Sequence, residues 1–130
     1  MASQDRKWQE LWDAADAKGR AAADEVVPVP MVVGTPTTPL GNDIDFSQRT
    51  YFVSEGVCGF AWVKVRPGTS SFARWLVRTG KSRGKAYHGG VDIWIGDFGQ
   101  SMQRKEAYAR AMAQVFTEAG IKAYAQSRLD

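Results

Sequence analysis

Residues 100–130 read QSMQRKEAYARAMAQVFTEAGIKAYAQSRLD, and this stretch decides the fold. Its apolar side chains recur at spacings of three and four residues, which places them on one face of an α-helix, and polar side chains fall on the opposite face. A helix with one apolar face needs a flat apolar surface to pack against. The apolar positions are Met102, Tyr108, Ala109, Met112, Val115, Phe116 and Ala119.

The two ends of this helix carry recognisable signals. Ser101 is placed to cap the helix N-terminus. Gly120 is placed to end the helix, and Ile121 beyond it can fold back onto Phe116, as a Schellman ending requires. The sequence therefore predicts a helix over residues 101–119 and then a short strand over 121–128.

Three stretches alternate in the two-residue period of a β-strand: residues 57–66, 91–96 and 121–128. In each, one face is small and aliphatic and is suited to receive helices. The opposite faces collect aromatic and basic side chains: Phe60, Trp62, Trp94, Tyr124, Lys64, Arg66, Lys122 and Arg128.

The same kinds of sequence pattern predict the structure of the remaining segments. Residues 3–23 predict an amphipathic helix that Gly19 weakens by about 1 kcal/mol relative to alanine, and residues 69–79 predict a short helix. Residues 26–33 carry two prolines, which fits an edge strand or an irregular cover. Residues 49–54 alternate like a strand, and the Glu55-Gly56 pair predicts a hairpin to the strand at 57–66.

These elements predict an α+β fold: a mixed or antiparallel sheet of three to five strands, with two helices on one face and an N-terminal amphipathic helix. At 130 residues the chain is long enough for one core. We expect one domain over residues 1–130, in which 1–48 form the N-terminal helix and a proline-rich cover and 49–130 form the core of sheet and helices.

Charge is unevenly distributed along the chain. Net charge is +3, but residues 1–55 carry five bases and nine acids (5 − 9 = −4), while residues 56–130 carry twelve bases and five acids (12 − 5 = +7). Such asymmetry favours an anionic partner or contact between the two halves, although a solvated basic surface is an equal alternative. The amino terminus lacks the apolar run of a signal peptide, and no stretch is long enough to cross a membrane. We expect a cytoplasmic protein without membrane contact.

The aromatic and basic sheet face is the sharpest candidate site. Rings that stack on bases, next to cations that follow phosphates, are how proteins hold single-stranded nucleic acid or RNA. The alternative, which the two tryptophans of the first helix favour, is that this helix covers the face and makes it core. The predicted nucleic-acid-binding residues are Phe60, Trp62, Lys64, Arg66, Arg78, Lys81, Arg83, Lys85, Trp94 and Tyr124.

The glycine-rich loop after residue 80 contributes three of those cations, Lys81, Arg83 and Lys85. It lacks the spacing of a P-loop, so we predict a phosphate-binding loop or, alternatively, a solvated one. A binder of a nucleotide or another phosphorylated small molecule is one alternative function here. Because these side chains have little to pack against, reversing all three charges is expected to change stability by less than about 0.5 kcal/mol.

Trp8, Leu11 and Trp12 form an apolar stripe on the first helix. The stripe packs on its own domain or on another protein; the first is favoured, and the second makes the chain an interaction module or an inhibitor of a host protein. Self-association stays open. Cys58 is the one cysteine and His88 the one histidine. A catalytic dyad between them is disfavoured. We expect no metal and no cofactor, and we favour a binding protein over an enzyme.

Four blocks carry a resemblance: CGFAWV from Cys58, SFARWL from Ser71, GGVDIW from Gly89 and QSMQRKEAYA from Gln100. They resemble blocks of small uncharacterised bacteriophage proteins over about residues 50–130. The resemblance implies an accessory protein of the host cytoplasm that acts on nucleic acid or on a host component, and it assigns no site residue.

Overall fold

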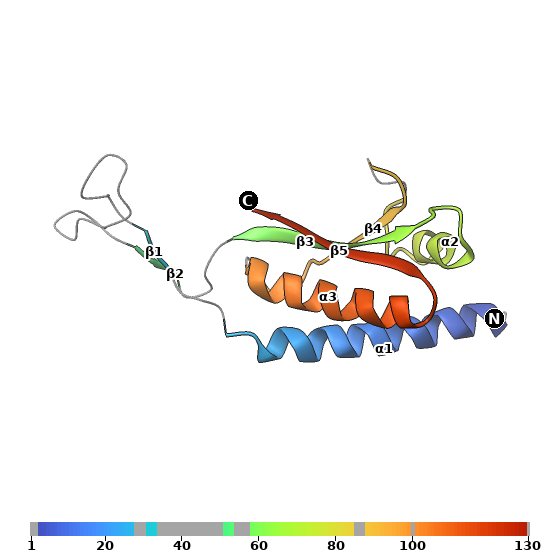
Figure 1. The fold of residues 1–130 in the computed structure, drawn as a ribbon, viewed down its shortest axis with the longest axis horizontal. Coiled ribbons are helices and arrows are strands. Elements are labelled where there is room, and N and C mark those ends of the chain that lie inside the picture. Colours follow the sequence, from blue (N-terminus) through green and yellow to red (C-terminus); the bar gives the residue numbers. More distant parts are fainter. Residues whose placement is uncertain are drawn as a thin grey trace.

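The computed structural model describes residues 3–27, 31–33, 51–53, 58–84, 88–99 and 101–129. These ranges contain three helices and a three-stranded sheet, which is the α+β class that the sequence predicts (Figure 1). In chain order the elements are α1 (Ser3–Glu25), β1 (Met31–Val33), β2 (Tyr51–Val53), β3 (Gly59–Arg66), α2 (Ser71–Arg78), β4 (Val91–Trp94), α3 (Met102–Glu118) and β5 (Lys122–Leu129).

The main sheet is antiparallel, with β3 between β4 and β5. Trp62 pairs with Trp94 on one side and with Gln126 on the other, and Lys64 pairs with Asp92 and with Tyr124. Cross-strand partners point to the same face of a sheet. The register therefore gathers the aromatic and basic side chains of all three strands on one face, as their alternation predicts.

One strand pairing differs from the sequence prediction. The hairpin expected between residues 49–54 and 57–66 is wrong, because both edges of β3 are occupied by β4 and β5, and β2 pairs antiparallel with β1 in a separate two-stranded sheet. The predicted turn at Glu55-Gly56 and most of the predicted proline-rich cover lie outside the described residues.

The aliphatic face of the sheet packs against α3. Ala61, Val63 and Val65 of β3 are fully buried, and so are Met112 and Phe116 of α3. The predicted ends of this helix are confirmed. The Ser101 hydroxyl accepts a hydrogen bond from the Arg104 N–H, and Gly120 adopts φ 87°, with Ile121 N–H donating to Phe116 O at 3.0 Å.

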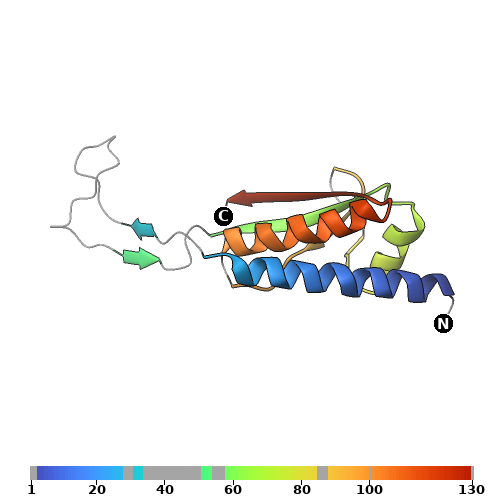
Figure 2. The same cartoon turned by 60° about the horizontal axis from the view of Figure 1, so that its bottom comes forward.

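Helix α1 lies along α3 on the side away from the sheet, which Figures 1 and 2 both show. Trp8 packs against Phe72 of α2 with ring centroids 5.1 Å apart, and Trp12 stacks on Phe116 at 6.5 Å. The tryptophan stripe is therefore satisfied within the molecule. The alternative in which α1 covers the aromatic sheet face is wrong, because α1 packs behind α3.

No helix among the described residues has the length and apolar character needed to cross a membrane.

Candidate functional site

The open face of the sheet, which we call the aromatic face, is formed by the even-numbered residues of its three strands. They lie in rows across the strands because the register pairs them directly. From one end of the sheet to the other the rows are Phe60 and Arg128; Trp94, Trp62 and Gln126; Asp92, Lys64 and Tyr124; Arg66 and Lys122.

Two tryptophans form the centre of this face. The rings of Trp62 and Trp94 lie 4.7 Å apart at an interplanar angle of 33°, and the Trp94 side chain is 48% exposed. Trp62 Nε1 donates to Gln126 Oε1 at 2.7 Å, which fixes the plane of the indole. The pair is thus held by the sheet yet keeps aromatic surface in contact with solvent.

A hollow of about 440 Å³ opens beside the tryptophan pair. This volume is within the range of roughly 300–1,000 Å³ of small-molecule sites, so it can receive a base and its sugar. Aromatic, basic and amide side chains share its lining, which consists of Trp62, Lys64, His88, Asp92, Trp94, Gln126 and Arg128.

Phe60 is surrounded by cations. Arg128 Cζ lies 5.3 Å from the ring centroid and Lys105 Nζ lies 5.7 Å from it, while the Trp94 ring meets its edge at 6.3 Å. Lys105 is buried and donates to Gly59 O at 3.2 Å. These contacts hold two cations beside the Phe60 ring, one of them Arg128 at the edge of the hollow.

Lys64, one of the predicted nucleic-acid-binding residues, is buried and paired. Its side chain is only 3% exposed, and Nζ lies 2.8 Å from Asp92 Oδ1 and 2.8 Å from Gly89 O. The contact with Asp92 is an ion pair without hydrogen-bond geometry, so the buried Oδ1 atom has no hydrogen bond among the described residues. Lys64 is therefore buried and paired with a carboxylate at the floor of the hollow, and its predicted contact with nucleic acid stays a prediction.

The glycine pair before β4 allows the turn to contact Lys64 at the floor of the hollow. Gly89 and Gly90 have φ angles of 85° and 68°, which side-chain-bearing residues rarely adopt. A Cβ at Gly90 would lie 2.7 Å from Val65 O, so the turn can approach β3 closely only because residue 90 is glycine. This approach brings Gly89 O to the Lys64 ammonium.

Of the other predicted bases, Arg66, Arg78 and Arg83 do not line the hollow. Arg66 is exposed at the end of the same face and donates to His88 O at 3.0 Å. Arg78 instead pairs with Asp5 of α1 at 2.7 Å. Arg83 is exposed in the loop after α2, and Lys85 lies outside the described residues.

Lys81 also departs from its prediction as a loop cation free to bind phosphate. Its Nζ lies 4.7 Å from the Trp75 ring centroid and 5.5 Å from that of Trp12. The ammonium therefore sits over aromatic rings between α1 and α2, on the helical side of the sheet.

Trp8, Leu11 and Trp12, the predicted protein interface, are partly buried against the core of the same chain. Cys58 and His88 stand at opposite ends of β3, since Cys58 precedes Gly59 and His88 O accepts from Arg66. An eight-residue strand separates them by roughly 25 Å, at about 3.3 Å per residue. They form no dyad.

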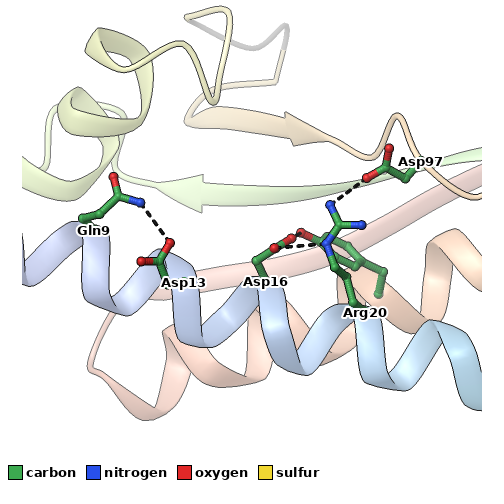
Figure 3. Close-up of polar contacts among 6 residues, drawn as sticks. Gln9, Asp13, Asp16, Arg20 and Asp97 are labelled. Atoms are coloured by element: carbon green, nitrogen blue, oxygen red, sulfur yellow. Dashed lines mark hydrogen bonds and ion pairs between the residues drawn. The ribbon is translucent and has the colours of Figure 1, made fainter.

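A second hollow, of about 250 Å³, lies between α1 and β4. Its polar groups are engaged with one another. Arg20 bridges Asp16 at 3.1 Å and Asp97 at 2.8 Å (Figure 3), which raises the Arg20 pKa through those two hydrogen bonds. The Tyr108 hydroxyl donates to Asp16. This network fastens α1 to α3 and to the segment after β4.

Tyr108 is the one group of this network with a large change in proton affinity. Burial raises its pKa most, and its hydrogen bond to Asp16 raises it further. A phenol that stays protonated and donates to a carboxylate is suited to joining two helices. The polar groups of the second hollow thus hydrogen-bond to one another and hold the helices together.

No protein-family model, curated protein or solved structure matches this chain, so its function rests on the geometry alone.

The list of predicted binding residues omits four residues of the hollow, His88, Asp92, Gln126 and Arg128, although Arg128 is predicted on the aromatic and basic face. Alternation places the last three on the correct face. Asp92 and Gln126 have no sequence signal for a site, because their roles come from cross-strand pairing with Lys64 and Trp62.

Proposed function

We propose that this chain binds single-stranded nucleic acid on the aromatic face, with one base in the hollow beside Trp62 and Trp94. The observation that carries the proposal is a tryptophan pair at the centre of a sheet face that no described helix covers, in which Trp94 is 48% exposed and Trp62 is partly buried beneath it. A soluble domain generally buries such rings, and here the core is completed by α3 on the other face.

Stacking supplies the attraction. An aromatic side chain that stacks on a base contributes roughly 1–3 kcal/mol, and it does so for every base because each has a π-face. Single-stranded substrates fit better than duplexes, since a paired base presents no free face to a sheet.

The cations around the pair supply the second contribution. Arg66, Lys122 and Arg128 are exposed on the aromatic face, while Asp92 is neutralised by Lys64. Contacts between three cations and phosphates predict a salt dependence with a slope of about −2, at about 0.7 per contact for single strands.

A fluorescence-anisotropy titration with labelled twelve-nucleotide DNA and RNA tests this proposal. Trp94→Ala should weaken binding by about 5- to 150-fold, the equivalent of 1–3 kcal/mol, and leave folding nearly unchanged. The matched control is Leu129→Ala, because Leu129 is 65% exposed on the opposite face, and its affinity should equal that of the wild type.

Salt dependence gives a second readout. Arg128→Ala should lower the slope by about 0.7, whereas Arg74→Ala, which removes an exposed arginine from α2, should leave it unchanged. Absence of binding at tens of micromolar in low salt, or a folded Trp94→Ala variant with wild-type affinity, would refute the proposal.

A further inference from the structure

The outer edge of β5 is the longest exposed strand edge of the main sheet. β5 has eight residues, and none of the strands in the described residues pairs with its outer side. The opposite edge strand, β4, has only four residues. Proteins commonly blunt such edges with proline, a bulge or an inward-pointing charge. Residues 123–127, AYAQS, contain neither proline nor charge.

The polar backbone groups that point outward can be assigned. Ile95 N–H donates to Ala61 O, so the polar groups of Ala61 and of every second residue of β3 face β4. The intervening residues of β3 face β5, and their partners on β5 are the even-numbered ones. Ala123, Ala125 and Ser127 therefore direct their N–H and C=O groups away from the sheet, and the carbonyl of Ala123 accepts from the Thr117 hydroxyl at 3.5 Å.

We propose that this edge pairs with the same edge of a second copy, giving a two-fold symmetric dimer with one continuous six-stranded sheet. A two-fold axis perpendicular to the sheet keeps the aromatic face on the same side in both copies. Directly opposed residues must then share a face, which allows an axis at Tyr124, Ala125 or Gln126.

Side-chain chemistry distinguishes the three axes. An axis at Tyr124 would set Lys122 opposite Gln126 of the second copy and leave Arg128 opposite Gly120, which precedes β5. An axis at Ala125 would set Lys122 opposite Arg128 of the second copy, and like charges directly opposite are destabilising. An axis at Gln126 sets Tyr124 opposite Arg128 of the second copy, a favourable pair of ring and cation. It also lets Ala125 and Ser127 exchange backbone hydrogen bonds across the edge.

The charges on α3 are also complementary across this two-fold axis. Glu106 and Arg110 of α3 line a shallow hollow next to Ala125, Gln126 and Ser127, and they pair weakly within one helix at 3.4 Å. Because a two-fold axis reverses the second α3, Glu106 of one copy faces Arg110 of the other. The sheet edge and the charge pair thus select one occupant, a second copy of this chain.

Sedimentation velocity of the full chain between about 1 and 100 µM, the range in which modest interfaces dissociate, tests this dimer. The wild type should shift from monomer to dimer with concentration. Ser127→Pro should remain monomeric, because proline removes an outward N–H without removing a bond to β3. Ser127→Ala is the matched control and should dimerise as the wild type does.

A charge reversal tests the same axis without altering the backbone. Arg110→Glu should weaken dimerisation at least about tenfold, because it sets two carboxylates against each other. The double variant Glu106→Arg with Arg110→Glu should restore it. A wild type that stays monomeric throughout, or a folded Ser127→Pro variant that dimerises normally, would overturn the proposal. Should Ser127→Pro fail to fold, an unchanged dimer in Arg110→Glu would overturn it.

Discussion

At the scale of single residues, Gly19 decides how closely α1 approaches α3. It is buried in the middle of a helix, where sequence reasoning sees only a weak helix former. A Cβ at this position would lie 2.5 Å from Cδ2 of Tyr108. That ring is fixed by its hydroxyl bond to Asp16 and by its contact with Phe98 at 5.6 Å, so it cannot move aside freely.

Gly19→Ala should therefore destabilise the protein although alanine is the better helix former. Overpacking costs about 1–3 kcal/mol, and because the Tyr108 ring is held on two sides we expect the upper part of that range, above the gain in helix propensity of about 1 kcal/mol. Urea denaturation measures the difference. The control is Gly96→Ala, where an added Cβ meets nothing within 4 Å. A Gly19→Ala variant more stable than the wild type would contradict this packing account.

At the scale of elements, the sequence predicts where a helix begins and ends better than it predicts which strands pair. The capping serine and the stop glycine of α3 act within one turn, so residues 101–120 carry all the information needed. The neighbour of a strand depends on distant segments, and the wrong hairpin between β2 and β3 reflects that. For the same reason the sequence could place Phe60, Trp62 and Trp94 on one face but could not show that Lys64 is buried.

The loop after α2 packs more closely than its sequence predicts. Lys81 N–H and Ser82 N–H both donate to Leu76 O, at 2.8 and 3.1 Å, so the start of the loop is fastened to α2. The Lys81 ammonium lies over Trp75 and Trp12. For Lys81 these contacts replace the expectation of unchanged stability with a prediction that charge reversal destabilises the protein.

Lys81→Glu should lower the free energy of unfolding by about 1–2 kcal/mol, because it replaces two favourable cation–ring contacts with a carboxylate above ring faces. Arg83→Glu, two residues further and exposed, should change it by less than about 0.5 kcal/mol. Lys81→Met keeps the apolar stem and should fall between them. Equal urea midpoints for the two glutamate variants would show that the ring contacts contribute nothing.

At the scale of the whole molecule, the two faces of the sheet separate folding from binding. The aliphatic face, α3 and α1 form one continuous core, whereas the aromatic face adds exposed rings and cations. Changes in the core should impair stability and binding together, and changes at Trp94 should impair binding alone. The proposed edge pairing would extend the aromatic face across two copies without altering either core.

The dependence of stability on alkaline pH reports on how α1 is fastened to this core. The pKa of Tyr108 is raised in the folded state, first by burial and then by its hydrogen bond to Asp16. An unfolded tyrosine ionises near pH 10. The stabilising contribution of Tyr108 is therefore fully present below about pH 10, and it declines above that value because the unfolded chain then loses a proton that the folded chain retains.

Tyr108→Phe removes this titration and keeps the ring in place. Below pH 10 the wild type should be more stable by the hydrogen bond to Asp16, which contributes about 1.5–3 kcal/mol because its acceptor is charged. By pH 11 that advantage should shrink by about 1.4 kcal/mol, the free energy of ionising the unfolded phenol one unit above its pKa. Urea denaturation of both proteins at pH 8 and pH 11 measures this change, and lysine titration cancels in the difference. A constant difference between the two proteins would mean that Tyr108 ionises as readily in the folded state as in the unfolded chain, and that the bond to Asp16 does not hold its proton.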